Sequence, residues 1–113
     1  QREQAWDLAR PTLVELRAWA IGVVGKDVPL PEVAPIGARE VRILDRRAAL
    51  MRVAVGGDEV TYLVQHARGI SPARVEREEG ELRAVAWRRG KLSCVLVGPK
   101  ATSKAWLAPF GPP

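Results

Sequence analysis

Apolar and polar residues change their spacing along this chain, from a helical period near its start to alternation from residue 37 onward. Early apolar side chains recur at three- and four-residue intervals, which gives a helix one apolar face: Leu13, Leu16, Ala20 and Val23. We expect a helix within residues 1–25, spanning 2–24. Thr12 and Glu15 have capping-box spacing, while Pro11, which a helix interior does not tolerate, leaves the first helical residue open.

Prolines at positions 29, 31 and 35 interrupt residues 26–36, so no helix continues there and a central strand is disfavoured. We expect this segment to be an extended connector. Beyond it, β-prone runs alternate with turn residues. The five predicted strands are 39–44, 48–55, 59–65, 81–88 and 91–97. In the third strand one face carries Val60, Tyr62 and Val64, and the other carries Thr61, Leu63 and Gln65.

The remaining segments lack a clear period. Residues 66–80 are predicted to form a mobile loop, and residues 99–113 a tail with one helical turn at 105–107. The pattern therefore predicts an α+β fold: an antiparallel sheet of about five strands arranged in hairpins, with a leading N-terminal helix over one face. We expect a single domain, 1–113, made of the helix, the connector 26–36, the sheet 37–98 and the tail.

Charge adds a class of partner to consider. The formal net charge is +5 and the pI is about 10.1, with arginine far more frequent than lysine. The arginines are spread along the chain, and glutamates interrupt them between residues 76 and 81, which is typical of a solvated sheet face. Arg46, Arg47, Arg88 and Arg89 lie at predicted hairpin turns. They are candidate contacts for an anion or a partner, and the alternative is that they are ordinary solvated turn residues.

The sequence contains few residues that suit catalysis. Cys94 and His66 are the only cysteine and the only histidine, which excludes an internal disulfide and sites built on several histidines. A nucleophilic triad would need Cys94 or Ser93 beside His66, with Asp58 or Glu59 to orient the imidazole. Ser93 and Cys94 fall on opposite strand faces, so at most one could serve. Walker-type, Rossmann-type and CxxC patterns do not occur. We expect no enzyme, no cofactor and no metal.

Residues 56–60, Gly-Gly-Asp-Glu-Val, nearly match the GGDEF signature of diguanylate cyclases. A metal-phosphate site would need further carboxylates on neighbouring strands, and no second acidic cluster lies on a predicted strand. Gly-Gly-Asp is also good hairpin chemistry. We therefore interpret this segment as a turn between two strands.

Nucleic-acid binding is the main alternative suggested by the charge. Binders of single strands combine a basic groove with exposed stacking aromatics. Only Tyr62 and Trp87 among the aromatic residues fall on predicted strands, and Tyr62 shares its face with valines, which favours the core. Trp87 heads the last hairpin, 84–98, and is interpreted as closing one end of the sheet.

With the strands placed, the order of motifs resembles a known family. Ile-Gly-Ala-Arg at 36–39 precedes the turn Asp-Arg-Arg-Ala-Ala at 45–49; a Gly-Gly hairpin then leads into 60–64, and Ala-Trp-Arg-Arg-Gly at 86–90 into Leu-Val-Gly at 96–98. This order resembles the extracytoplasmic domain of transmembrane anti-sigma factors, in which a GR-x-A turn and a W-R-x-G … L-V hairpin recur. The chain departs from the family at Arg47, where proline is frequent, and at Met51–Val53, where an aromatic is usual.

The resemblance implies a non-enzymatic sensor or interaction domain on the periplasmic face of the inner membrane. Its partners would be a signalling protein or a protease, and an extracytoplasmic-function sigma factor would be bound by a separate zinc-type cytoplasmic domain. A homodimer formed through an exposed strand edge is a further expected assembly. The chain opens on Gln1 and contains no apolar run long enough to span a membrane, so the family would place the anchor upstream. A signal is expected to act at the connector or at residues 66–80. The alternative is a basic nucleic-acid-binding or ribosome-associated module.

Overall fold

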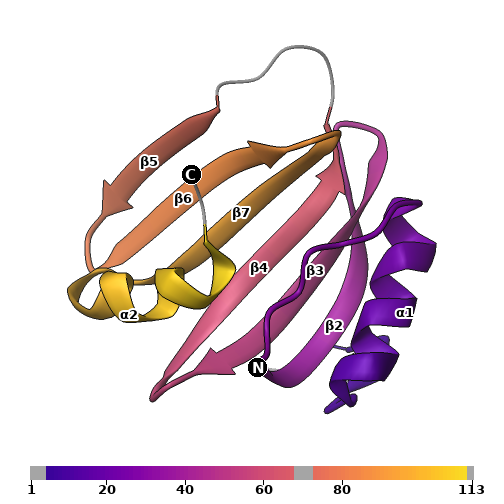
Figure 1. The fold of residues 1–113 in the computed structure, drawn as a ribbon, viewed down its shortest axis with the longest axis horizontal. Helices are drawn as coiled ribbons and strands as arrows, with labels where there is room; N and C mark the ends of the chain where they lie inside the picture. Colours follow the sequence, from indigo (N-terminus) through magenta and orange to yellow (C-terminus); the bar gives the residue numbers. More distant parts are fainter. Residues whose placement is uncertain (1–4, 68–72, 112–113) are drawn as a thin grey trace.

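A computed structural model describes residues 5–67 and 73–111, and within them the chain forms an α+β fold (Figure 1). In chain order the elements are β1 (Leu8–Ala9), α1 (Leu13–Val24), β2 (Ala34–Ile43), β3 (Arg46–Val55), β4 (Asp58–His66), β5 (Arg74–Glu79), β6 (Leu82–Arg89), β7 (Leu92–Pro99), η1 (Lys100–Thr102), α2 (Ser103–Leu107) and η2 (Ala108–Phe110). The strands form one antiparallel sheet in the order β1-β2-β3-β4-β7-β6-β5. Two runs of hairpins, β2–β4 and β5–β7, thus meet along β4 and β7.

The prediction of about five strands is too low, because the described chain has seven. One additional strand is β5, which we expected to lie in the loop 66–80. It pairs along its whole length with β6 through a turn at Gly80, whose φ of 61° suits glycine. Arg74 and Arg83 both form ion pairs with Glu76, which links β5 to β6 through their side chains as well. Residues 68–72 of the predicted loop lie outside the described residues.

The helix begins later than predicted. Helix α1 spans Leu13–Val24, and its N-cap Thr12 forms the expected capping box: the Glu15 backbone N–H donates to the Thr12 hydroxyl at 3.1 Å, and the Thr12 N–H to the Glu15 carboxylate at 2.8 Å. The residues just before it are not helical, because Arg10 has a positive φ of 49° and Leu8–Ala9 pairs with β2 as strand β1. The helix ends on Gly25 in the left-handed conformation.

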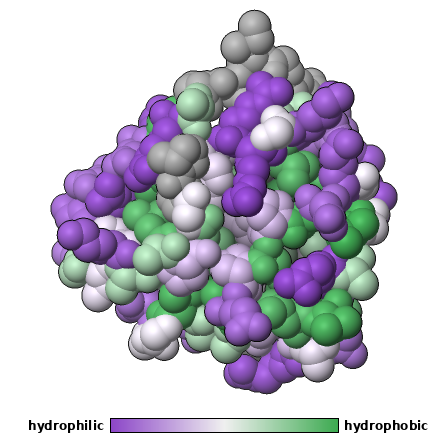
Figure 2. All heavy atoms as spheres, viewed as in Figure 1, coloured by the Kyte–Doolittle hydropathy of each residue, from purple (hydrophilic) through white to green (hydrophobic). Residues whose placement is uncertain are grey.

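One face of the sheet carries the hydrophobic core. Cross-strand neighbours form a buried row across it: Ala38, Met51, Tyr62, Leu96 and Val85. Helix α1 packs over β2 and β3, and α2 over β7, on the same side of the sheet (Figure 1). Seen from this side, much of the surface is hydrophilic, with apolar side chains between the polar ones (Figure 2).

The proline-rich segment between α1 and β2 crosses the same face. Val28 is buried in the core, and Leu30 and Val33 pack against it. The Tyr62 hydroxyl, from β4, donates a hydrogen bond to the Pro29 carbonyl at 2.7 Å. The connector therefore belongs to the layer that covers the core. No helix or strand is assigned to residues 26–33, and β2 begins at Ala34, within the segment expected to be the connector.

The C-terminal segment completes this layer. The helical turn predicted at 105–107 is present within α2, and its Trp106 is fully buried. The Trp106 indole N–H donates to the Pro99 carbonyl at 2.8 Å, and its ring lies over Gly98, where a Cβ would come within 2.8 Å of it. Phe110 packs on Tyr62 with ring centroids 4.8 Å apart, and Trp87 stacks near Tyr62 at 6.3 Å. Trp87 thus faces the core, where it serves the architecture.

Candidate interaction face

The second face of the sheet is also apolar along its middle. Strand register aligns one row of neighbours across six strands, each directly opposite the next: Arg39, Leu50, Leu63, Val95, Ala86 and Val75. We call this the central row. None of its side chains belongs to the hydrophobic core or packs against it. We call the whole side of the sheet that carries this row the open face.

Within residues 5–67 and 73–111, the helices and the connector join the core on the opposite side of the sheet. On the open face the Trp6 indole lies over Gly37, where a Cβ would come within 2.5 Å of it, at the β2 end of the sheet. No helix of the described chain covers Leu50, Leu63 and Val95. An antiparallel sheet with one face in water normally places polar residues on that face. Here Leu50, Leu63 and Val95 form its centre, and a contiguous apolar patch of this kind marks an interaction site in many soluble proteins.

Arginines surround the central row. The row on one side of it contains Arg52, Thr61, Val97, Ala84 and Arg77, and the row on the other contains Val41, Ala48, Gln65, Ser93 and Arg88. Arg46 extends the same face beyond Ala48, by strand alternation. The open face of the described strands thus holds five arginines and no lysine. Its acidic residues are Glu59 and Glu79, which face the same way by register.

Two of these arginines have no partner among the described residues. Arg52 donates to the Glu59 carboxylate and to the Thr61 hydroxyl, each at 3.3 Å. By contrast, no hydrogen bond or ion pair holds the guanidinium of Arg39 or of Arg77 within the described chain, and the Nε of Arg39 is buried. The terminal nitrogens of Arg39 are not buried, so they can donate to an external acceptor, and hydrogen bonds to a charged group of this kind are favourable.

The four arginines predicted as partner contacts lie at one end of the sheet but form no single cluster. Arg46 and Arg47 lie on β3, and Arg88 and Arg89 on β6; β4 and β7 separate these two strands, a span of about 14 Å at the usual strand spacing. Arg46 and Arg88 project from the open face, whereas Arg47 and Arg89 project from the other side.

The pair on the open face, Arg46 and Arg88, donates to nearby backbone carbonyls. Arg46 donates to the Ala67 carbonyl at 3.5 Å, and Arg88 to the Gly90 carbonyl at 3.0 Å. These bonds hold both side chains near the turns.

The pair on the other side of the sheet, Arg47 and Arg89, has different surroundings. Arg47 forms a two-pronged ion pair with Glu40, at 2.8 and 3.1 Å, and these hydrogen bonds lower the pKa of the Glu40 carboxyl and raise the pKa of Arg47. Arg89 lines a surface cavity of about 400 Å³ together with Arg17 and Asp27. Arg47 is therefore already satisfied within the chain.

The residues considered for nucleophilic catalysis do not meet. Cys94 is fully buried and faces the core, while Ser93 lies on the open face. His66 ends β4 and Asp58 begins it, which puts them about 27 Å apart along an extended strand. The Gly56–Gly57 segment forms the predicted hairpin, and Glu59 is used in an ion pair with Arg52. No group of three or more His, Cys, Asp or Glu in the described chain is arranged to hold a metal ion.

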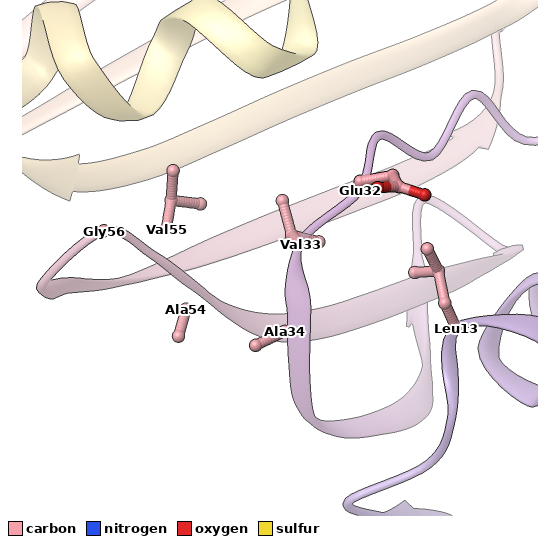
Figure 3. Close-up of a pocket in the computed structure, with 7 residues that line it drawn as sticks. All are labelled: Leu13, Glu32, Val33, Ala34, Ala54, Val55 and Gly56. Atoms are coloured by element: carbon pink, nitrogen blue, oxygen red, sulfur yellow. The ribbon is translucent and has the colours of Figure 1, made fainter.

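A surface cavity of about 490 Å³ lies where α1 begins beside β2 and the β3–β4 hairpin. Figure 3 shows that aliphatic side chains surround it, among them Leu13, Val33 and Val55, with Glu32 as the one charged residue of the lining. Among the described residues, Glu32 is thus the one titratable group that lines this cavity.

The Tyr62 hydroxyl also lies 3.8 Å from the Cys94 Sγ, inside the core. Burial raises the pKa of both groups above their ordinary values of 10.0 and 9.0. The folded protein therefore keeps both protons at a pH where the unfolded chain has lost them. Proton loss then favours the unfolded state, so we expect the free energy of unfolding to fall as pH rises above about 9.

Urea denaturation at pH about 8 and about 10.5 measures this slope. The double variant Tyr62→Phe, Cys94→Ala removes both groups, so its stability should depend less steeply on pH over the same range. An unchanged slope in the double variant would show that other groups cause the dependence.

The strand alternation in the sequence did not single out Leu50, Leu63 and Val95. The sequence does contain a signal for them: residues 48–51 and 94–97 are unbroken apolar runs, and such runs are typical of strands with apolar residues on both faces.

No helix among the described residues has both the length and the apolar character to cross a membrane. Comparison with protein-family models, with curated proteins and with solved structures gives no match to this chain.

Proposed function

We propose that this chain is a non-enzymatic interaction domain that binds a partner protein through its open face. The observation that carries the proposal is the central row: its apolar side chains are continuous across the five strands β3, β4, β7, β6 and β5, arginines flank them, and no helix of the described chain covers them. Interface centres are typically apolar and depleted in charge, and arginine is enriched at interfaces whereas lysine is depleted.

We further propose that the domain is the periplasmic sensor part of a membrane-anchored anti-sigma factor. The order of the hairpins supports this role, because the turn 45–49, the Gly-Gly hairpin and the Trp87 hairpin follow one another as in the family that the sequence resembles. Binding of a partner on the periplasmic side would favour one of two states of the longer protein. Contact with the sigma factor would belong to a separate cytoplasmic domain.

Nucleic-acid binding is less well supported by the arrangement of the aromatic rings. Tyr62, Trp87, Trp106 and Phe110 are buried in the core, so they offer no base-stacking platform. A gel-shift assay with single-stranded DNA and RNA tests this alternative, since binding of that kind weakens steeply with salt.

A chromosomal variant tests the proposed regulatory function. We expect the double change Leu63→Asn, Val95→Asn in the native gene to alter a defined set of transcripts, because it makes the centre of the open face polar. Deleting the cognate sigma-factor gene should abolish expression of the same set. The matched control is Val14→Asn, which changes an aliphatic residue that is 73% exposed on α1, away from the open face. If transcripts respond equally to both variants, or to neither, the proposed function is wrong.

A further inference from the structure

We propose that the open face binds an acidic amphipathic helix of a partner protein. Its aliphatic stripe would lie along the central row, and carboxylates near its two ends would meet Arg39 on β2 and Arg77 on β5. This inference rests on the proposed function, since it specifies the partner of the same face.

The dimensions of the face define the length of the ligand. Arg39 and Arg77 lie on strands separated by five strand spacings, or about 24 Å. A helix that spans this distance has about 16 residues. Between the two arginines the helix would lie over Leu50, Leu63 and Val95, so it needs aliphatic residues at three- and four-residue spacing.

A helix suits this face better than an extended peptide does. The inner strands beneath the central row are hydrogen-bonded to neighbours on both sides, so the face offers no free backbone groups with which a peptide could pair. An extended peptide would bury unpaired N–H and C=O groups against aliphatic side chains. Burial of such unpaired groups usually costs about several kcal/mol. A helix satisfies these groups internally.

The charges of the face call for carboxylates. Its described residues include five arginines against two glutamates, and Glu59 is already paired with Arg52. The planar guanidinium matches a carboxylate with two parallel hydrogen bonds. In Arg39 the Nε is buried but the two terminal nitrogens are not, and these nitrogens, which have no acceptor in the described chain, can donate to a carboxylate.

Other occupants fit these observations less well. A second copy of this chain docking face to face would bring two arginine-rich surfaces together, and like charges in an interface cost free energy. An anionic membrane surface favours helices with lysine or arginine beside protruding aromatic residues. The open face instead presents short aliphatic side chains on a sheet, with Leu63 and Val95 at its centre.

Binding of designed peptides tests the proposal on the whole chain. The probe is a 16-residue amphipathic helix with leucines along one stripe and glutamates near both ends, and the comparison peptide carries lysine at every glutamate position. Isothermal titration should give micromolar binding of the acidic peptide and none of the basic one. The change Arg39→Ala should weaken binding about tenfold, as expected for removing one charged partner. The control change Arg89→Ala lies on the other side of the sheet and should leave binding unaltered.

Three outcomes would overturn the proposal: no binding of the acidic peptide, equal weakening by Arg39→Ala and Arg89→Ala, or tighter binding to anionic vesicles or to single-stranded RNA. The chromosomal experiment separates this failure from that of the proposed function. If Leu63→Asn, Val95→Asn still alters the transcripts while the acidic peptide does not bind, the face is functional and only the assigned partner chemistry is wrong.

Discussion

Replacing Trp106 by alanine is expected to lower the free energy of unfolding by about 3–5 kcal/mol, the usual cost of removing a buried tryptophan. Trp106 is fully buried, packs over the bare backbone of Gly98 and donates its indole N–H to the Pro99 carbonyl. Its loss opens a cavity between α2 and β7 and leaves that carbonyl without its donor. Domains of this size have about 5–15 kcal/mol of stability, so the variant should be near its folding threshold.

Chemical denaturation followed by circular dichroism measures the effect. Lys104→Ala is the matched control, because Lys104 is an exposed residue of the same short helix and alanine keeps the helical propensity. We expect this control to stay within about 0.5 kcal/mol of the parent chain. A Trp106→Ala variant as stable as the control would mean that α2 and the last residues are not part of the core.

Two consecutive residues of β4 should lose very different amounts of stability on the same change. Val64 is fully buried in the core, so Val64→Asn places an unpaired amide there and removes apolar contacts, with an expected loss of more than about 3 kcal/mol. Leu63 lies on the open face, where an asparagine side chain reaches water. Leu63→Asn should therefore cost about 1 kcal/mol or less, the range of strand preferences at exposed positions.

The comparison of these variants has a built-in control, since both change the same strand and introduce the same side chain. Urea denaturation of the two proteins gives the difference directly. Equal losses at Leu63 and Val64 would mean that both faces of the sheet are covered in solution.

Local patterns predicted the elements that carry their own signals. The capping box at Thr12, the hairpin turns and the burial of Tyr62 follow from residue types and spacing, and the structure has all three. Strand β5 carries no such signal, because its glutamates and arginines do not alternate with apolar residues. It is a strand because β6 offers a free edge and the turn at Gly80 brings the two together. Strand β1 likewise depends on pairing with distant β2.

Predicting the open face requires the strand register as well as the alternation of side chains along each strand. The sequence shows that Leu63 points away from Tyr62, but it does not show that Leu50 and Val95 are its direct neighbours on β3 and β7. That alignment follows from the strand order, in which β4 pairs with β7 and not with the next strand along the chain. The same strand order keeps the arginines of the β2–β3 turn apart from those of the β6–β7 turn. The sequence suggested these arginines only as individual contacts.

The most direct test of this account is whether the open face is accessible to solvent. Addition of a soluble gadolinium chelate broadens the methyl signals of residues that solvent reaches, and methyl-labelled protein reports each residue separately. We predict strong broadening for Leu50, Leu63 and Val95 on the open face and little for Val64 and Leu96 in the core. Equal protection of the two sets would contradict the central claim that the second face of the sheet is an uncovered interaction surface.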